Sequence, residues 1–284
     1  MFRVSTLILT VLAAQISCPF GRFTRRLVGL MNHSLGIPAC LTIVLLLQAP
    51  DLFAQHYLPR AEIRVEVNKT LIVASDPRPL LQAVQGLRAR YGWLLPYEDP
   101  VYTDQELLDI SRPDLGDRPR QYTRIAGGEF RAEFPSTDGI QELTVVEKIV
   151  TAYNQSGNPG KFMVRPAGSD FAVVGINTSA DRSPATKLSV LDTLVNIPEQ
   201  QRSTGETIEA ILNAVAAKTG RKLALASGPV NRLQSSKVNI GAVEQPAREA
   251  LLKTLAGMGG VWSWNLLYDP NTQTYMFNVV PLSQ

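Results

Sequence analysis

The amino-acid sequence predicts an α+β fold of two tandem two-layer sandwiches, each a small mixed sheet with two helices on one face. Runs with alternating apolar residues, typical of strands, are interspersed with runs whose apolar residues recur every three to four positions, typical of helices. The same order of elements occurs twice along the chain. The 284 residues are 45% hydrophobic, which is sufficient for one large core or two small ones.

Residues 1–54 are predicted to be a signal or leader segment. They contain two apolar runs, at 4–16 and 35–47, and each is shorter than the roughly 20 residues that a transmembrane helix requires. Basic residues, a short apolar run and a small residue, Ala54, before the expected cleavage site are typical of a secretory signal. We therefore expect an exported protein in the periplasm or otherwise outside the cytoplasm. An uncleaved leader that tethers the chain to a membrane is the alternative.

Charge and cysteine content exclude several classes of function. The net charge of +3 belongs to the leader, so the body is electrically neutral. A neutral body gives no electrostatic basis for binding nucleic acid, or for membrane contact other than through the leader. Both cysteines, Cys18 and Cys40, lie in the leader. The body therefore has no disulfide, thiolate zinc site or cysteine nucleophile.

The first unit is predicted over residues 55–176, with an insertion at 98–120 that is rich in Pro, Asp and Arg. Its elements are strand, strand, helix, strand, strand, helix and hairpin, at residues 61–67, 70–74, 75–92, 93–99, 122–134, 140–154 and 161–176. In the first helix, Asp76 suits the cap, Pro77 the first turn and Gly92 the stop.

A polar linker at 177–186 leads to the second unit, residues 187–284. Its elements are strand, helix, strand, strand, helix and hairpin, at residues 187–197, 204–220, 221–227, 236–243, 244–259 and 260–280. Thr204 suits the cap of the first helix, and Gly220 its stop. Pro246 lies near the first turn of the second helix. The order of elements matches the first unit, although few residues are identical.

The second half resembles the secretin and TonB short N-terminal (STN) domain. The resemblance rests on a helix that ends in Thr-Gly, an apolar strand and the stretch "VNIGAVEQPAREALLKTLAGMG", and it covers residues 204–282. We interpret the first half as a divergent second copy. The resemblance implies an exported module that binds other proteins or assembly partners, and it implies no channel.

No catalytic, cofactor-binding or metal-binding residue is predicted, and no cofactor. His56 is the only histidine of the body and lies beside the expected cleavage site, so a Ser–His–Asp triad has no usable base. The nucleotide-binding glycine motifs and the common serine-nucleophile motifs are absent from the sequence. "GMGG" at 257–260 precedes a strand and is interpreted as a helix stop.

Seven acidic residues lie in the insertion. They are Glu98, Asp99, Asp104, Glu106, Asp109, Asp114 and Asp117. A calcium site or a catalytic carboxylate pair is one interpretation. We favour a solvated loop with a short helix capped by Thr103, because the spacing fits no calcium-binding loop.

Aromatic residues are expected to pack in cores. Tyr91, Trp93 and Tyr97 lie where a strand enters the first core. In the last hairpin, alternation places a set of large residues on the face that meets the two helices of the second unit. These residues are Trp262, Trp264, Leu266 and Tyr268. The opposite face should lie outside the core, because only one face of a two-layer sandwich is covered.

The sequence as a whole favours a non-catalytic extracytoplasmic protein-interaction module in envelope assembly, secretion or transport. Its partner would be another envelope protein that adds a strand to an exposed sheet edge. One alternative is a carboxylate-based hydrolase of cell-wall glycan, which needs two acids about 5–10 Å apart in one cleft. Another is a carrier of a small apolar ligand, which needs a pocket between helices and sheet.

Overall fold

The computed structural model describes residues 61–110, 122–136, 141–177 and 189–282, which belong to one compact unit. The leader, the linker beyond residue 177 and insertion residues 111–120 lie outside the described residues. Helices and strands are mixed throughout, which confirms the predicted α+β class. None of the helices in the described ranges is long and apolar enough to cross a membrane.

The described residues of the first half form eight strands, two α-helices and a 3₁₀ helix. They are β1 (Glu62–Val65), β2 (Lys69–Ser75), α3 (Pro79–Tyr91), β3 (Tyr97–Glu98), η3 (Asp104–Glu106), β4 (Leu107–Asp109), β5 (Thr123–Ile125), β6 (Glu129–Pro135), α4 (Glu142–Gln155), β7 (Phe162–Ala167) and β8 (Asp170–Gly175).

Within residues 189–282, the second half forms five strands, three α-helices and a 3₁₀ helix. They are η5 (Val190–Asp192), β9 (Leu194–Ser203), α5 (Thr204–Thr219), β10 (Lys222–Ser227), α6 (Val230–Ser235), β11 (Lys237–Pro246), α7 (Ala247–Gly257), β12 (Trp262–Asp269) and β13 (Thr274–Pro281). The sequence pattern predicted neither the short helix α6 nor η5, which lies within the predicted strand 187–197.

The predicted glycine stops of the helices are confirmed, whereas the residues that begin or cap the helices differ from the predicted ones. Gly92 and Gly220 follow α3 and α5 in the left-handed conformation, which glycine adopts without strain. Helix α3 begins at Pro79, because the Asp76 carboxylate accepts the Arg78 amide in the turn before it. Ser203, not Thr204, caps α5 by accepting the Glu206 amide.

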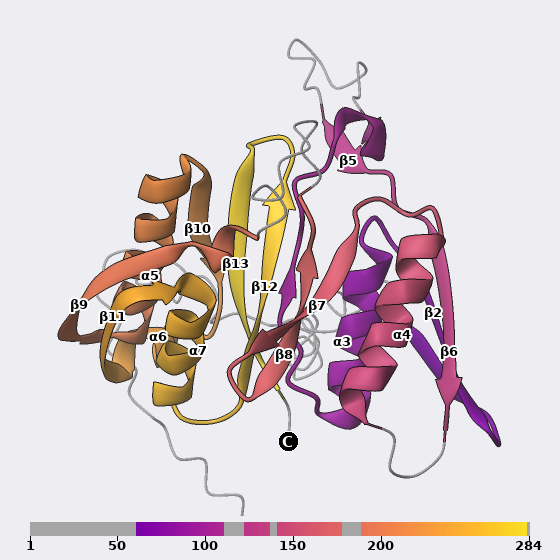
Figure 1. Cartoon of the computed structure of the whole chain (residues 1–284), viewed down its shortest axis with the longest axis horizontal. Helices are drawn as coiled ribbons and strands as arrows, with labels where there is room; N and C mark the ends of the chain where they lie inside the picture. Colours follow the sequence, from indigo (N-terminus) through magenta and orange to yellow (C-terminus); the bar gives the residue numbers. More distant parts are fainter. Residues whose placement is uncertain (1–60, 111–121, 137–140, 178–188, 283–284) are drawn as a thin grey trace, which may run out of the picture. The chain divides into compact units, whose positions relative to one another are not determined.

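The largest sheet has six strands in the order β10-β13-β12-β3-β8-β7 (Figure 1). Its centre is the pair β12–β3, which runs parallel and joins Asn265 with Tyr97 and Leu266 with Glu98. The separate sheets predicted for the two halves are therefore not found, since strands of both halves form one sheet. Smaller sheets are β1-β2-β6, β11-β9 and β4-β5.

Both halves use one pairing scheme. Antiparallel pairs β2–β6 and β9–β11 correspond, as do parallel pairs β3–β8 and β10–β13, and the final hairpins β7–β8 and β12–β13. Strand β10 is thus the counterpart of β3, and β7 the counterpart of β12. In the central sheet, β12 of the second half pairs with β3 of the first half in a head-to-tail arrangement. Their counterparts, β7 and β10, therefore remain at the two ends of the sheet.

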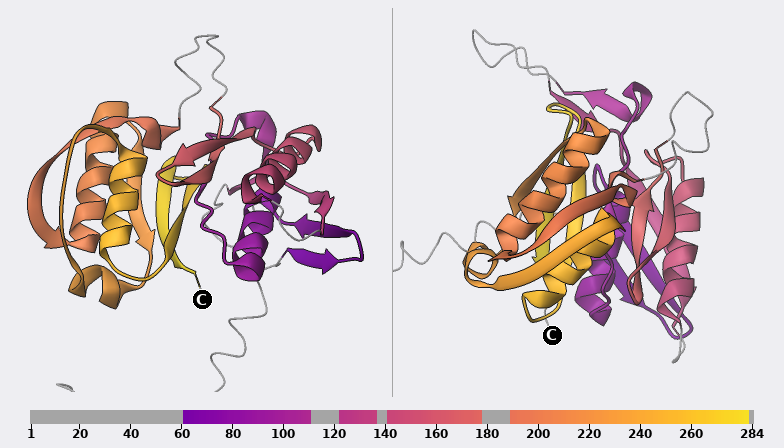
Figure 2. Two further views of the ribbon diagram at one scale, coloured as in Figure 1. Left: turned by 60° about the horizontal axis from the view of Figure 1, so that its bottom comes forward. Right: turned by 60° about the vertical axis from the view of Figure 1, so that its left-hand side comes forward.

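The two helix pairs cover opposite faces of this sheet (Figures 1 and 2). Trp264, Leu266 and Tyr268 pack in a core with α5 and α7, as predicted. The neighbouring Leu267 packs against the core of α3 and α4. The prediction that the second face of β12 lies outside a core is wrong, because the first half covers it and buries Asn265.

The aromatic residues after α3 pack largely as expected. Tyr97 is buried in the first core, and Trp93 packs against that core. Tyr91 stacks on Trp93 with ring centroids 4.8 Å apart, but its side chain remains partly exposed. Neither of the two hollows described below is lined by Tyr91 or Trp93.

Candidate functional site

The outer edge of β7 is closed to further strands. The Asn154 side-chain amide donates to the Phe162 carbonyl at 2.8 Å, and the Phe162 amide donates to the Asn154 side-chain oxygen at 2.9 Å. Pro166, farther along β7, has no N–H to donate. A capped residue and a proline on one short strand are typical of edges that resist pairing.

The outer edge of β10 has no proline and no side-chain cap among its described residues, and its one irregularity is a bulge between Leu225 and Ser227. Strand β10 pairs with β13 alone among the described strands. Ala224, Ala226 and Ser227 are exposed, and Leu223 and Leu225 are half-buried against the core. An edge strand presents unpaired N–H and C=O groups that can pair with another chain. Strand β10 is therefore the available end of the six-stranded sheet.

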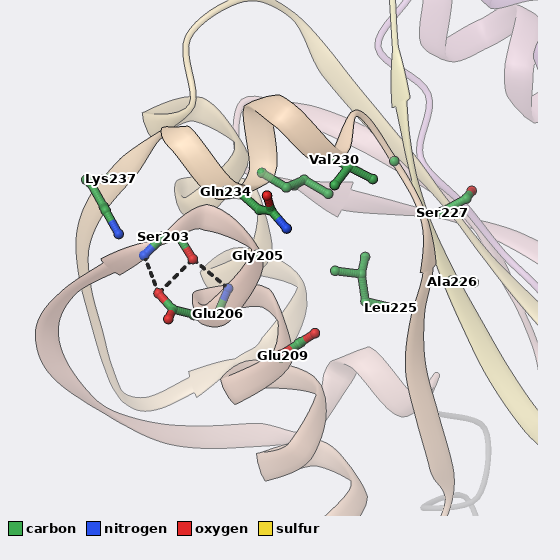
Figure 3. Close-up of a pocket in the computed structure, with 12 residues that line it drawn as sticks. Ser203, Gly205, Glu206, Glu209, Leu225, Ala226, Ser227, Val230, Gln234 and Lys237 are labelled. Carbon is green, nitrogen blue, oxygen red and sulfur yellow. Dashed lines mark hydrogen bonds between the residues drawn. The ribbon is translucent and has the colours of Figure 1, made fainter. Parts of the chain in front are cut away.

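A groove of about 510 Å³ lies beside β10, between that strand, the start of α5 and helix α6 (Figure 3). Its apolar lining consists of Leu225, Val230 and Leu233. Leu225 points into the groove from the strand, while Glu209 faces it from α5 (Figure 3). Val230 is 60% exposed, which is unusual for an apolar residue without a partner to cover it.

Local sequence explains the shape of this groove. The Ser203 amide and hydroxyl both donate to the Glu206 carboxylate at 2.7 Å, which fixes the start of α5 (Figure 3). Gly228 lets the chain leave β10 close to α6, since a Cβ there would lie 2.9 Å from the Leu233 side chain. The polar rim is completed by Gln234 and Lys237.

A second hollow, of about 430 Å³, lies on the opposite face of the sheet and also reaches β10. Ala226, Leu267 and Met276 contribute from the strands, and Arg78 and Arg124 from neighbouring segments. Among the described residues, Arg124 has no ion-pair partner and is exposed. Because successive residues of a strand face opposite sides, a strand added to β10 would direct its side chains into the two hollows alternately.

The acidic insertion is only partly the solvated loop that the sequence predicted. Glu98 and Asp99 are buried, which corrects that prediction for these two residues. Asp104 and Asp109 are exposed, and Asp114 and Asp117 lie outside the described residues. Thr103 and Glu106 are joined by two hydrogen bonds, but the short helix is a single 3₁₀ turn followed by β4.

Glu98 is neutralised by residues of the second half. We call the parallel pair β3–β12 and the side chains around it the joint between the halves. Arg248 of α7 donates to both its carboxylate oxygens, at 2.7 and 2.9 Å, and Ser189 donates a hydroxyl. Arg248 also pairs with Asp192. The joint thus holds one buried cation between two carboxylates, an arrangement in which each charge has partners.

Asp99 is satisfied by four donors. These are the Arg78 guanidinium, the Tyr97 and Tyr102 hydroxyls and the Tyr268 amide. Burial, with the nearby Asp99 charge, raises the pKa of both Tyr97 and Tyr102 well above the usual value. Both therefore remain hydroxyl donors, and the cluster has a structural role at the joint.

Arg88 makes the reciprocal contact from the first half. It donates to the Asn265 side chain at 2.7 Å and to the carbonyls of Leu95 and Trp264. Burial lowers the pKa of Arg88 to about 9, so the guanidinium remains charged at neutral pH. Each half therefore inserts a buried arginine next to the adjoining strand of the other half.

Two carboxylates, Glu206 and Glu209, share the β10 groove, and the sequence analysis missed this pair. Hydrogen bonds from Ser203 lower the pKa of Glu206, opposite to what a general acid requires. Burial, with Asp170 nearby, raises the pKa of Glu142 to about 7, but Glu142 lies at the start of α4 and not in this groove. No described cluster of His, Cys, Asp and Glu could hold a metal ion.

Comparison with protein-family models, with curated proteins and with solved structures finds no match to this chain. The resemblance to the STN domain therefore stays a prediction. The geometry of β10 and its two hollows is the feature from which a function can be inferred. The sequence predicted β10 as a strand but contained no local signal that it would form the end of the sheet.

Proposed function

We propose that this protein is a non-catalytic extracytoplasmic protein-binding module that accepts an extended segment of a partner as an added strand on β10. One observation carries the proposal: of the two ends of the central sheet, β7 is closed by Asn154 and Pro166, whereas the outer edge of β10 pairs with no described strand. An unprotected edge is a hazard unless it is used, because any exposed strand can pair with it.

The groove supports this mode of binding. In strand addition, main-chain hydrogen bonds supply affinity and pockets for alternate side chains supply specificity. Strand β10 offers both, with an unpaired edge and a hollow on each face. The predicted secretory leader and the STN resemblance favour another envelope protein as the partner.

A glycan hydrolase is the second candidate, since Glu206 and Glu209 line one groove. The Ser203 hydrogen bonds argue against it, because they stabilise the ionised form of Glu206. An apolar-ligand carrier is less well supported, because the groove has a charged rim of Glu206, Glu209 and Lys237. Turnover of peptidoglycan that disappears in a Glu209→Gln variant would favour the hydrolase.

The proposal is tested by capture from the envelope of the native host with the full chain, processed as the cell processes it. Val230→Lys places a charge on the apolar wall of the groove and should abolish capture. Val67→Lys is the matched control, because Val67 is 95% exposed, lies after β1 and is not in the groove.

A photoreactive residue at Ala224 then identifies what lies against β10. We expect one protein that is crosslinked there by the wild type and by the Val67→Lys variant, but not by the Val230→Lys variant. Equal capture by all three proteins, or crosslinks only to positions outside β10, would contradict the proposal.

A further inference from the structure

The pairing of β12 with β3 is a template for how a further strand could pair with the outer edge of β10. Strand β12 lies along β3 in parallel orientation. Tyr97 of β3 lies five residues after Gly92, and Leu225 of β10 lies five residues after Gly220, the counterpart stop. Both strands also pair in parallel with the last strand of their own hairpin, β8 or β13. The edge that β12 fills on β3 is therefore the edge that is open on β10.

We propose that the partner strand runs parallel to β10 and places a basic side chain in the α5 groove and an acidic side chain in the opposite hollow. This inference rests on the proposed function and specifies its ligand. In the β3–β12 pair, Asn265 lies opposite Tyr97 on the face covered by α3 and α4, the helices of the half that contains β3. Leu266 lies opposite Glu98 on the face covered by α5 and α7. A guest residue opposite Leu225 thus faces α5. Strand β10 bulges at Ala226, which lines both hollows, so the next guest residue can reach the second hollow there.

The α5 groove suits a long side chain with an apolar stem and a cationic head. Leu225, Val230 and Leu233 form an apolar wall that the stem of Lys or Arg can cover. Glu209 lies at the rim and has no hydrogen-bond or ion-pair partner among the described residues. Together with Glu206, it outweighs Lys237, so the rim has an excess of negative charge.

The opposite hollow suits an acidic side chain. Its two arginines, Arg78 and Arg124, outnumber its one acid, Asp269. Arg78 is already held by Asp99, and Asp269 by Asn271 and Thr272. Arg124 is left as the exposed cation of this hollow, and it can pair with a carboxylate that extends from the residue opposite Ala226.

The guest is a different protein and not a second copy of this chain. The strand that corresponds to β12 is β7, and Asn154 and Pro166 close its edge. The polar residues that secure β12 on β3 also have no counterparts here, since Ala226 stands in place of Glu98 and Ala216 in place of Arg88. A guest with its own charges is expected instead.

The test uses synthetic peptides of about 8 residues, a common strand length, in which Lys and Glu alternate. Binding to the full chain is measured by fluorescence anisotropy at low and high salt. Glu209→Lys and Arg124→Glu should each weaken binding about fivefold, as expected for the loss of one exposed ion pair, and salt should reduce the difference. Glu147→Lys, an exposed change on α4, is the control and should bind as the wild type does.

Orientation is read from a benzophenone at either end of the peptide. A parallel guest crosslinks its amino end near Lys222 and its carboxyl end near Val230. The reverse order would overturn the parallel orientation and leave the proposed function intact. A peptide with Gln in place of Lys and Glu that binds equally well, or the absence of any peptide binding, would overturn the assigned chemistry. The proposed function is tested separately, by whether a protein partner is captured and crosslinked on β10.

Discussion

At the scale of single residues, the joint depends on a buried arginine. Arg248 neutralises Glu98, which is fully buried, and it also pairs with Asp192. Replacing Arg248 by Met keeps an unbranched apolar stem but leaves the Glu98 carboxylate buried without a cation. Breaking a buried pair in this way costs about 3–5 kcal/mol. We expect a decrease of that size in the free energy of unfolding, measured by urea denaturation.

The control removes both charges. In the double variant Glu98→Leu/Arg248→Met, the fully buried carboxylate is removed together with its cation. Asp192 also loses its Arg248 partner but is partly exposed, so the free energy of unfolding should recover to within about 2 kcal/mol of wild type and not fully. If the double variant is as unstable as Arg248→Met alone, the loss comes from packing around the arginine and not from the unpaired carboxylate.

Glu142 gives the fold a pH dependence. Burial, with Asp170 nearby, raises its pKa from 4.5 to about 7 in the folded protein. The folded state therefore holds a proton that the unfolded state has lost between these pH values, and stability must fall as pH rises from about 4.5 to 7. Because Glu142 is only half-buried, solvent screening should limit the change to about 1 kcal/mol or less.

Urea denaturation of the wild type at pH 5 and pH 8 should show this decrease, whereas the Glu142→Gln variant should lack it. The exposed Glu147→Gln change on the same helix is the control and should leave the pH dependence unaltered. A decrease that persists in Glu142→Gln would assign it to another group.

At the scale of elements, a close approach between the β5–β6 connection and the start of α3 requires glycine. A Cβ at Gly127 would lie 2.3 Å from the Pro77 carbonyl oxygen, whereas a Cβ at the neighbouring Gly128 would meet nothing within 4 Å. Gly127→Ala must push the chain before α3 away, and with it Arg78, the partner of Asp99. We expect a loss of about 1–3 kcal/mol, as for other overpacked sites.

Gly128→Ala is the matched control, and its effect should stay within about 0.5 kcal/mol. Thermal unfolding of the two variants side by side measures the difference. Equal melting temperatures would mean that the connection can shift without strain.

Local sequence patterns predicted most elements but not the joint. The signals of α5 and α7 are a polar cap, a proline and a glycine, and these act within a few residues of the helix ends. Glu98 and Arg248 are separated by 150 positions, so no local pattern could show that they meet. In the sequence, Glu98 is one of seven acidic residues in a polar stretch. Unless its contact with Arg248 is known, nothing distinguishes it from a solvated acid.

The order of strands was out of reach for the same reason. The strand pattern at 221–227 is visible in the sequence, but its place at the end of a six-stranded sheet depends on the parallel pairing of β3 with β12. That pairing also explains why Asn265 is buried: the first half covers the second face of β12, and Arg88 satisfies the amide.

At the scale of the whole molecule, the joint pairs two different strand edges, one from each half, and such a contact can in principle repeat from molecule to molecule. Strand β12 of one half meets β3 of the other, and repeating the same contact would bring β7 of one molecule to β10 of the next. A contact of this heterologous kind does not close on itself by twofold symmetry and continues to larger assemblies. Asn154 and Pro166 block it by closing the edge of β7.

Opening that edge should therefore make the protein associate with itself. In the double variant Asn154→Ala/Pro166→Val, the Phe162 main-chain groups become free and residue 166 gains an N–H. Sedimentation velocity over a range of concentrations should show species that grow beyond dimers, whereas the wild type should not. Adding Ala226→Lys places a charge on the β10 edge and should reverse the association. Growth that Ala226→Lys leaves unchanged, or species that stop at dimers, would mean that the molecules meet through another surface.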